Sequence, residues 1–273
     1  YKYGIKQTCS YDQMKSLSEL IDLGVYAFDG AERYGWRLDD LNYFRSHTNL
    51  EVSTKIRLSC LEQNQCPSSI GHSFLQHLDG VNIKIIYMHD SISDTFLERF
   101  QLLLSCDEKM RNFEWGLSIY TQYDVDLITK WKPPCRFIQA PLNPLTRLRL
   151  DRLTELGYTV IARSIFLQGL YFVKSTSIPG GINHLKFERH AALIQQYASK
   201  LGISCGQVLF SFALVKAKRL KCDGVVIGGS ATQRIKTYVD SHEYVSTQID
   251  TEYIDSLWYN EVFSDPRLWT QLP

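Results

Sequence analysis

The sequence predicts an α/β fold of the (β/α)8 barrel type, and three observations support this prediction. Short apolar runs alternate with segments of helical periodicity along most of the 273 residues. Several of these runs end in polar side chains, as at Asp29, Lys55 and His89. No Gly-x-Gly-x-x-Gly pattern follows a strand-like run, which weakens the doubly wound alternative.

Seven apolar runs have the length and composition of strands. They cover residues 24–29, 51–55, 83–89, 113–118, 136–140, 158–163 and 224–228. Because helix-length segments separate most of them, we expect parallel strands joined by right-handed crossovers. A closed barrel of eight strands needs one more. Its natural place is before Tyr1, so we expect the first strand to be missing from the N-terminus of this sequence.

The segments between the strands place apolar side chains at helical spacing. The first helix is expected to begin near Ser10 and to stop before Gly24. Further helices are predicted over residues 95–104, 122–131, 148–156, 187–201, 205–218 and 231–240. The most loop-like stretch, 174–181, is interpreted as a long loop at the active face and not as a linker. A single domain over residues 1–273 is therefore expected.

Composition narrows the classes of function. The net charge is +1 and basic clusters are absent, which argues against nucleic acid or an anionic membrane as the main partner. No apolar run approaches the roughly 18–20 residues that span a bilayer. The seven cysteines form no CxxC pair and the histidines show no metal-ligand spacing, so reduced thiols and a cytoplasmic location are expected. The oligomeric state stays open.

Four residue types with complementary chemistry lie at or near predicted strand ends. Asp29 ends the first strand and Tyr34 follows five residues later, Lys55 ends the second strand, and His89 ends the third. The C-terminal ends of parallel barrel strands converge on one mouth, so we expect these side chains to gather there. An acid, a tyrosine, a lysine and a histidine together would form a proton-donor site.

With these residues the chain resembles the aldo-keto reductases over nearly its whole length. The family's Asp-x-Ala-x-x-Tyr-Gly stands at residues 29–35, its Thr-Lys at Thr54-Lys55 and its strand-end histidine at His89. Later landmarks follow in the family's order: Gly116-Leu117-Ser118, Gln139 with Asn143, and residues 162–169. A narrower likeness is to a bacterial branch associated with surface-polysaccharide biosynthesis. It is carried by Tyr3-Gly4-Ile5, Ser118-Ile119-Tyr120, residues 162–169 and residues 265–269.

The resemblance implies reduction of a small-molecule carbonyl with NADPH. It assigns Tyr34 as proton donor, Lys55 and Asp29 as the pair that tunes it, and His89 as the group that orients the carbonyl. The chemistry is consistent, because a tyrosine hydroxyl with a pKa of about 10 needs a nearby ammonium to become a useful acid. Trp36, directly after the Tyr-Gly, is expected to line the substrate pocket.

The resemblance also implies residues that hold the cofactor. Ser118 and Gln139 would bind the nicotinamide amide, although Ile119 stands where an asparagine is usual. Arg163 replaces a tyrosine that many members stack on the nicotinamide. Pyrophosphate contacts are assigned to Ser164, Leu167 and Gly169, and a second phosphate segment to Gly228, Gly229, Ser230 and Arg234. Arg234 would pair with an adenosine 2′-phosphate, which favours NADP over NAD.

Simpler explanations exist for each residue on its own. Asp29 and Lys55 could form a structural salt bridge, His89 could cap the next helix, and Arg234 could be an ordinary exposed arginine. Two other functions also stay open: a cofactor-binding scaffold or sensor with little turnover, and an unrelated barrel lyase. The first would not need the four proposed catalytic residues, and the second would not need a nicotinamide pocket.

Overall fold

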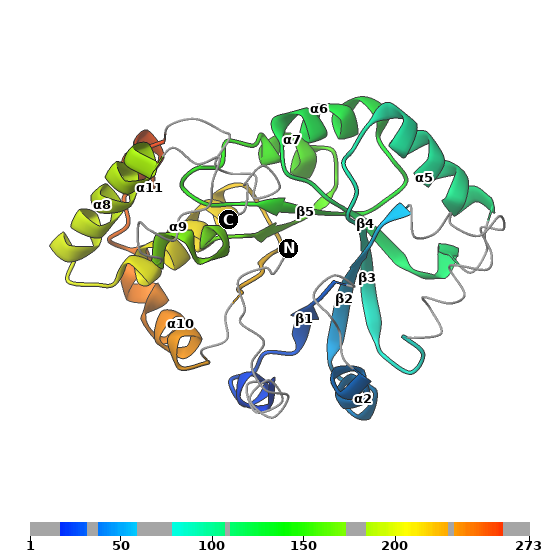
Figure 1. Ribbon diagram of the computed structural model, residues 1–273, viewed down its shortest axis with the longest axis horizontal. Helices are drawn as coiled ribbons and strands as arrows, with labels where there is room; N and C mark the ends of the chain where they lie inside the picture. The colour runs from blue at the N-terminus through cyan, green and yellow to red at the C-terminus, as the bar shows by residue number, and fades with distance from the viewer. Residues whose placement is uncertain are drawn as a thin grey trace. The chain divides into compact units, whose positions relative to one another are not determined.

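The computed structural model describes residues 17–31, 38–58, 78–106, 110–172, 184–228 and 232–258 (Figure 1). The chain forms two compact units. The first unit lies within Gln7–Gln139 and Arg152–Thr159, and the second within Tyr1–Lys6, Ala140–Asp151 and Val160–Pro273. Strands and helices alternate in the described residues, as the apolar periodicity predicts.

The strands of the first unit pair in parallel and in the order of the chain. They are β1 (Ala27–Asp29), β2 (Glu51–Ile56), β3 (Ile83–Met88), β4 (Glu114–Ser118) and the first part of β5 (Phe137–Pro141). The register shifts between Val52 and Ser53, where β3 carries one extra residue. Such irregularities re-aim the side chains that follow. After the shift, Lys55 pairs with Tyr87, beside the C-terminal ends of both strands.

The second unit contains most of β6 (Thr159–Arg163) and all of β7 (Gly224–Val225), which pair in parallel through Ile161 and Gly224. Strands β5 and β6 belong to both units. Thr159 donates its N–H to the Arg136 carbonyl in the first unit, and Leu142 donates to the Arg163 carbonyl in the second, both at 2.9 Å.

The prediction of parallel strands in an α/β fold is confirmed by the strand order β1 to β7 among the described residues. Most strand ends differ from the predicted bounds by one to three residues. The largest differences are three residues, at the start of β1 and at the end of β7, where the predicted strand 224–228 is reduced to Gly224 and Val225. The eighth strand expected before Tyr1 lies outside the described chain.

The predicted helices are found in place with shifted ends. They are α5 (Asp94–Cys106), α6 (Gln122–Trp131), α7 (Leu150–Glu155), α8 (His184–Lys200), α9 (Cys205–Arg219) and α10 (Thr232–Ser246). Two helices without a prediction are α2 (Leu38–Ser46) and α11 (Thr251–Ser256). Short 3-10 turns occupy Met110–Asn112 and Leu167–Phe172. The first predicted helix is seen over residues 17–22, and the stretch 174–181 lies outside the described residues.

A capping box fixes where α6 begins after β4. The hydroxyl of Thr121 accepts the N–H of Asp124, and the Asp124 carboxylate accepts the N–H of Thr121. The same carboxylate oxygen also accepts the N–H of Tyr120 at 2.8 Å. These bonds satisfy donors that a helix start leaves without partners, so the turn between Ser118 and α6 has one defined conformation.

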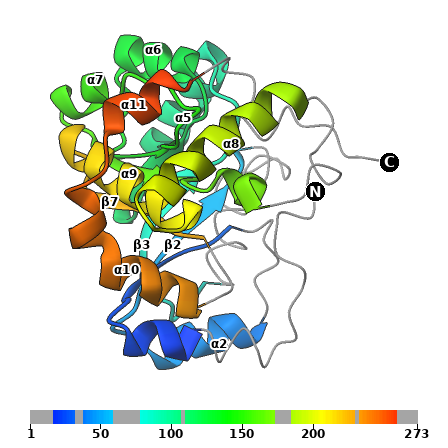
Figure 2. The same ribbon diagram turned by 90° about the vertical axis from the view of Figure 1, so that its left-hand side faces the viewer.

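Helix α9 forms the centre of the second unit, in contact with α8, α10 and α11 (Figure 2). Its side chains Val208, Leu209, Phe210 and Phe212 are buried among apolar neighbours. The absence of a side chain at Gly206 lets the hydroxyl of Tyr238 approach, because a Cβ there would lie 2.2 Å from that oxygen. Apolar burial of this kind is the main source of the unit's stability.

Ion pairs and hydrogen bonds connect α11 and Leu257 to other parts of the second unit. The carboxylate of Asp255 pairs with Lys216 at 2.5 Å and with Arg147 at 3.2 Å. Buried His190 binds the Leu257 carbonyl through Nδ1 at 3.0 Å, and its Nε2 lies 2.9 Å from the Tyr171 hydroxyl. Burial lowers the pKa of His190 to about 4, so the ring is neutral at pH 7. Because a carbonyl only accepts, Nδ1 carries the proton and Nε2 accepts from Tyr171.

Within the described residues, no single helix is long and apolar enough to cross a membrane. One bent pair, α8 with α9, passes that test by length and composition alone.

Gly116 in β4 provides a test of how tightly the sheet of the first unit is packed. A Cβ at this position would lie 2.5 Å from the Tyr87 ring and 2.8 Å from the Phe137 carbonyl oxygen. We therefore expect Gly116→Ala to lower the free energy of unfolding by about 1–3 kcal/mol. Urea denaturation measures this change.

Gly224 in β7 is the matched control, because its Cβ would lie 3.6 Å from Ile161 in ordinary contact. We expect Gly224→Ala to change the free energy of unfolding by less than about 1 kcal/mol. Equal losses in the two variants would contradict the packing described for Gly116.

Candidate active site

A buried ion pair joins the C-terminal ends of β1 and β2. The Lys55 ammonium donates to Oδ2 of Asp29, and its second bond, 3.4 Å long, is to the Gly30 carbonyl. The exposed fraction of the side chain is 1% for Lys55 and 13% for Asp29. Removing two charges from water is costly, so a buried pair of this kind is a weak argument for a purely structural role.

Gln139 of β5 also binds Asp29. Its Nε2 donates to Oδ1 of Asp29 at 3.0 Å. A carboxylate can only accept, so this bond fixes which end of the amide is nitrogen. The opposite atom, Oε1, is buried and has no hydrogen-bond partner among the described residues. A buried acceptor without a partner costs about 1–3 kcal/mol, and such an atom calls for an explanation, of which a bound group is one.

The contact between Gln139 and Asp29 shows that the sheet of the first unit is strongly curled. β1 and β5 are separated by three intervening strands. In a flat sheet they would be about 19 Å apart, at the usual spacing of neighbouring strands. The direct bond at 3.0 Å requires the C-terminal ends of these strands to converge. This is the geometry that concentrates polar side chains at one mouth.

Tyr87 covers the lysine of this pair. Its ring is 1% exposed and its centre lies 5.9 Å from Nζ of Lys55. Burial, and then the negative charge of Asp29, raise the pKa of the Tyr87 hydroxyl well above its usual value. Tyr87 is therefore a neutral packing residue, not a proton donor near neutrality.

His89 follows β3 directly and stands at the same end of the sheet. Its N–H donates to the Ile56 carbonyl at 2.8 Å, which extends the pairing of β2 with β3. Its Nε2 lies 2.8 Å from the hydroxyl of Tyr120. The alternative role as a helix cap is filled by another residue, because Ser93 accepts the N–H of Phe96 in the first turn of α5.

Ser118 is the last residue of β4, 1% exposed, and it pairs with Gln139. Ile119, where an asparagine was expected, is completely buried and donates its N–H to the Gln139 carbonyl at 2.9 Å. The next residue, Tyr120, is a contact that the sequence does not predict, because its hydroxyl binds His89. A tyrosine two residues beyond a strand end, just before an N-cap threonine, was the available signal.

In the second unit, Arg163 ends β6 and is 8% exposed. Its Nη1 donates to the Ser164 hydroxyl at 3.0 Å. Asn143 donates its side-chain amide to the Ser164 carbonyl at 3.2 Å. Ser164 is thus held on both its side chain and its backbone, at the point where the chain leaves the strand.

The turn after β6 has an unusual backbone. Residues Ser164, Leu167, Gln168 and Gly169 have φ values of 56°, 46°, 53° and 82°. Positive φ is easy for glycine but costs other residues about 1–3 kcal/mol each, and such strain clusters at functional sites. The strained turn includes each residue assigned to the pyrophosphate.

The second phosphate segment is described only in part. Gly228 follows β7 with open space where a Cβ would be, and Arg234 lies exposed in the first turn of α10. Gly229 and Ser230, like Tyr34 and Trp36, lie outside the described residues.

The structure thus brings Asp29, Lys55 and Gln139 into direct contact, and it joins His89 to Tyr120. Ser118 is linked to Gln139 by strand pairing. All of these residues lie in the first unit. The other cofactor candidates, Arg163, Ser164, Leu167, Gly169, Gly228 and Arg234, lie in the second unit.

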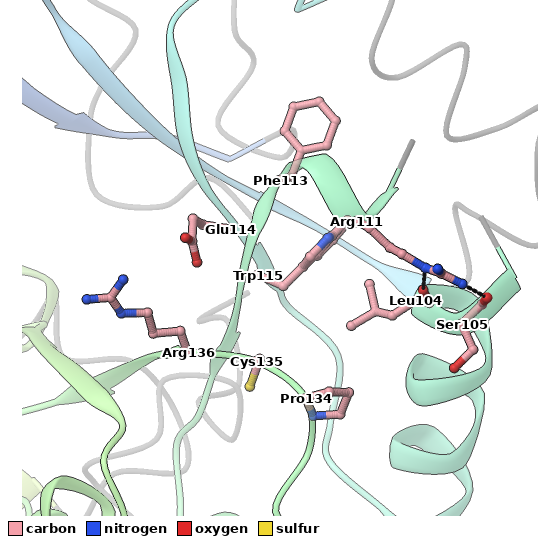
Figure 3. A pocket seen from close by; sticks show the side chains of 9 residues that line it. All are labelled: Leu104, Ser105, Arg111, Phe113, Glu114, Trp115, Pro134, Cys135 and Arg136. Atoms are coloured by element: carbon pink, nitrogen blue, oxygen red, sulfur yellow. Dashed lines mark hydrogen bonds between the residues drawn. The ribbon is translucent and has the colours of Figure 1, made fainter. Parts of the chain in front are cut away.

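A cavity of about 520 Å³ lies at the opposite ends of the strands of the first unit, beside Glu114 at the start of β4 and Arg136 just before β5 (Figure 3). Arg111 points to the end of α5, where it donates to the Leu104 carbonyl at 3.1 Å. Burial raises the pKa of the Cys135 thiol to about 12, so this thiol is unreactive. The cavity is separate from the polar strand ends. In the described ranges, no group of three or more His, Cys, Asp or Glu side chains could hold a metal ion.

Solved structures share this fold. Aldo-keto reductase AKR11C1 from Bacillus halodurans is 16% identical, with a TM-score of 0.64 over 92% of this chain and 88% of that one. The thermostable aldo-keto reductase Tm1743 is 17% identical, with a TM-score of 0.61 over 94% and 92%. Glycerol dehydrogenase AKR11B4 from Gluconobacter oxydans is 17% identical, with a TM-score of 0.58 over 91% and 90%.

A search of curated proteins gives no significant match. The sequence model of the aldo/keto reductase family, in contrast, matches residues 3–259, which is nearly the whole chain. Together with the converging polar strand ends, this match identifies the chain as an oxidoreductase that belongs to the aldo/keto reductase family.

Proposed function

We propose that the protein reduces a small aldehyde or ketone to an alcohol with NADPH, with Tyr34 as the proton donor. The observation that carries this proposal is the contact set of Asp29, Lys55 and Gln139, which leaves one buried acceptor open. A salt bridge kept only for stability would not need an unsatisfied amide oxygen beside it.

The residues of the first unit suit the proton side of the reaction. Asp29 keeps the Lys55 side chain charged and fixed, and a fixed ammonium lowers the pKa of a tyrosine hydroxyl placed near it. Tyr34 follows β1 by a few residues and would supply that hydroxyl. His89 would donate a hydrogen bond to the carbonyl oxygen as negative charge develops there.

The residues also fit a nicotinamide dinucleotide. Oε1 of Gln139 is an acceptor that a carboxamide N–H would satisfy, and Ser118 is its strand neighbour. When bound, the reduced nicotinamide would supply the hydride. The phosphates would be held by Arg163, Ser164, Leu167, Gly169, Gly228, Gly229, Ser230 and Arg234. The strained turn after β6 supports this assignment, since strain of this kind persists where function requires it.

Several further features belong to this proposal. The chain would form one domain over residues 1–273, of the (β/α)8 barrel type. The curled sheet of the first unit supports the barrel. The proposal also includes a cytoplasmic location and contact between the substrate and Trp36. The substrate would be derived from a sugar and used in surface-polysaccharide synthesis. The last point rests on the likeness to the bacterial branch.

A cofactor-binding scaffold with little turnover is the second candidate. Ile119 favours it, because its buried side chain provides no hydrogen bond where an asparagine amide was expected. The Asp29–Lys55 pair speaks against it, since binding a cofactor without turnover does not require a buried ammonium.

Replacement of Tyr34 by phenylalanine tests the proton donor. The change keeps the ring and removes only the hydroxyl. We expect Tyr34→Phe to lower kcat for a generic aldehyde by about 10²–10⁴-fold, the usual contribution of general acid catalysis. Cofactor affinity and thermal stability should stay near wild type. Consumption of NADPH measures the rate.

The control is Tyr26→Phe, at a tyrosine that is 63% exposed just before β1. This variant should retain wild-type activity. Activity that persists in Tyr34→Phe would mean that another group delivers the proton.

Replacement of Arg234 by alanine tests cofactor preference. If Arg234 pairs with the 2′-phosphate, Arg234→Ala should weaken NADPH binding about tenfold or more and leave NADH binding nearly unchanged. Fluorescence titration measures both affinities. Lys236→Ala, an exposed cation two residues along α10, is the control and should change neither affinity. Equal loss for both cofactors in Arg234→Ala would show a structural role.

A further inference from the structure

Tyr120 and His89 face each other at the C-terminal ends of neighbouring strands. Oη of Tyr120 lies 2.8 Å from Nε2 of His89. The two rings are inclined by only 20°, with centroids 6.1 Å apart. Tyr120 is 6% exposed, so water competes weakly for this hydrogen bond.

The backbone on both sides of this contact is fixed. Tyr120 donates its N–H to the carboxylate of Asp124, which is 5% exposed and closes the capping box of α6. His89 donates its N–H to the Ile56 carbonyl. The start of α6 therefore fixes the backbone of Tyr120, and the pairing of β2 with β3 fixes the backbone of His89.

A hydroxyl held at Nε2 restricts the imidazole in two ways. It limits rotation of the ring about the bond to Cβ, and it occupies one of the two ring nitrogens. A neutral imidazole has one donor and one acceptor nitrogen, while a hydroxyl can fill either role. When the Tyr120 hydroxyl donates to Nε2, the proton of the neutral ring is on Nδ1, which is then the nitrogen that can donate to a carbonyl oxygen.

We propose that Tyr120 is a positioning residue for His89. Its hydroxyl fixes the plane and the hydrogen-bonding edge of the imidazole that orients the substrate carbonyl. The catalytic part of this inference rests on the proposed carbonyl reduction, whereas the structural part concerns the free protein. An aromatic side chain needed only for packing would serve equally well as phenylalanine.

The free protein gives the first test, without cofactor or substrate. The ring ¹⁵N signals of His89 are identified among the seven histidines by their loss in His89→Gln. In Tyr120→Phe we expect these signals to shift. Tyr123→Phe is the control, because Tyr123 lies three residues away and is 61% exposed, and it should leave the signals unchanged. Unchanged His89 signals in Tyr120→Phe would overturn the inference.

Activity gives the second test. Tyr120→Phe should lower kcat/KM for a generic aldehyde about three- to tenfold, the size of one hydrogen bond, and mainly through kcat. In a His89→Gln background the same change should cost nothing further, because Tyr120 acts through His89. Equal losses in both backgrounds would show that Tyr120 acts independently and would overturn the inference.

The two tests separate the inference from the proposed function. If the wild-type protein reduces no aldehyde or ketone, the proposed function fails. The ¹⁵N comparison still decides whether Tyr120 positions His89. If reduction occurs and Tyr120→Phe matches wild type in both tests, only the positioning role is wrong. Melting temperatures of the variants confirm that each one folds.

Discussion

The buried pair of Asp29 and Lys55 is the interaction on which the rest of the site depends. An ammonium that is 1% exposed persists only with a partner, and removing one member of such a pair typically costs about 3–5 kcal/mol. Asp29 is in turn held by Gln139, 110 residues along the chain. This contact among three residues requires the sheet to curl, and it also places the carboxylate, the ammonium and the amide beside one another. The charge of Lys55 at the end of β2 is compensated by Asp29 of β1, and β5 holds Asp29 in place through Gln139.

The surrounding packing serves the same constraint. Gly116 leaves room for the ring of Tyr87, which covers Lys55, and burial keeps that ring neutral. Past the ends of β3 and β4, the backbone is set by the His89–Ile56 bond and by the capping box of α6. The polar groups of the first unit are therefore preorganised by strand register and helix capping. Preorganised dipoles stabilise developing charge better than groups that must first reorient.

The sequence predicts the strand ends well because two simple rules act there. Apolar runs mark parallel strands, and polar residues at their C-terminal ends must lie on one side of the sheet. The sequence does not predict which side chains form hydrogen bonds at these strand ends. Tyr120 meets His89 across 31 residues, and its place two residues beyond a strand end is a weak local signal that a packing residue could share. Helix α2 was missed because polar residues make up most of its sequence, which weakens the apolar periodicity that marks a helix.

In the proposed function, Oε1 of Gln139, beside the Asp29–Lys55 pair, receives the nicotinamide amide. Fluorescence titration of wild type and Gln139→Leu with NADPH tests it most directly, with 2′,5′-ADP as a ligand that lacks the nicotinamide. We expect NADPH binding to weaken about tenfold in the variant, while 2′,5′-ADP binds both proteins equally. Absence of NADPH binding to wild type, or equal weakening for both ligands, would contradict it.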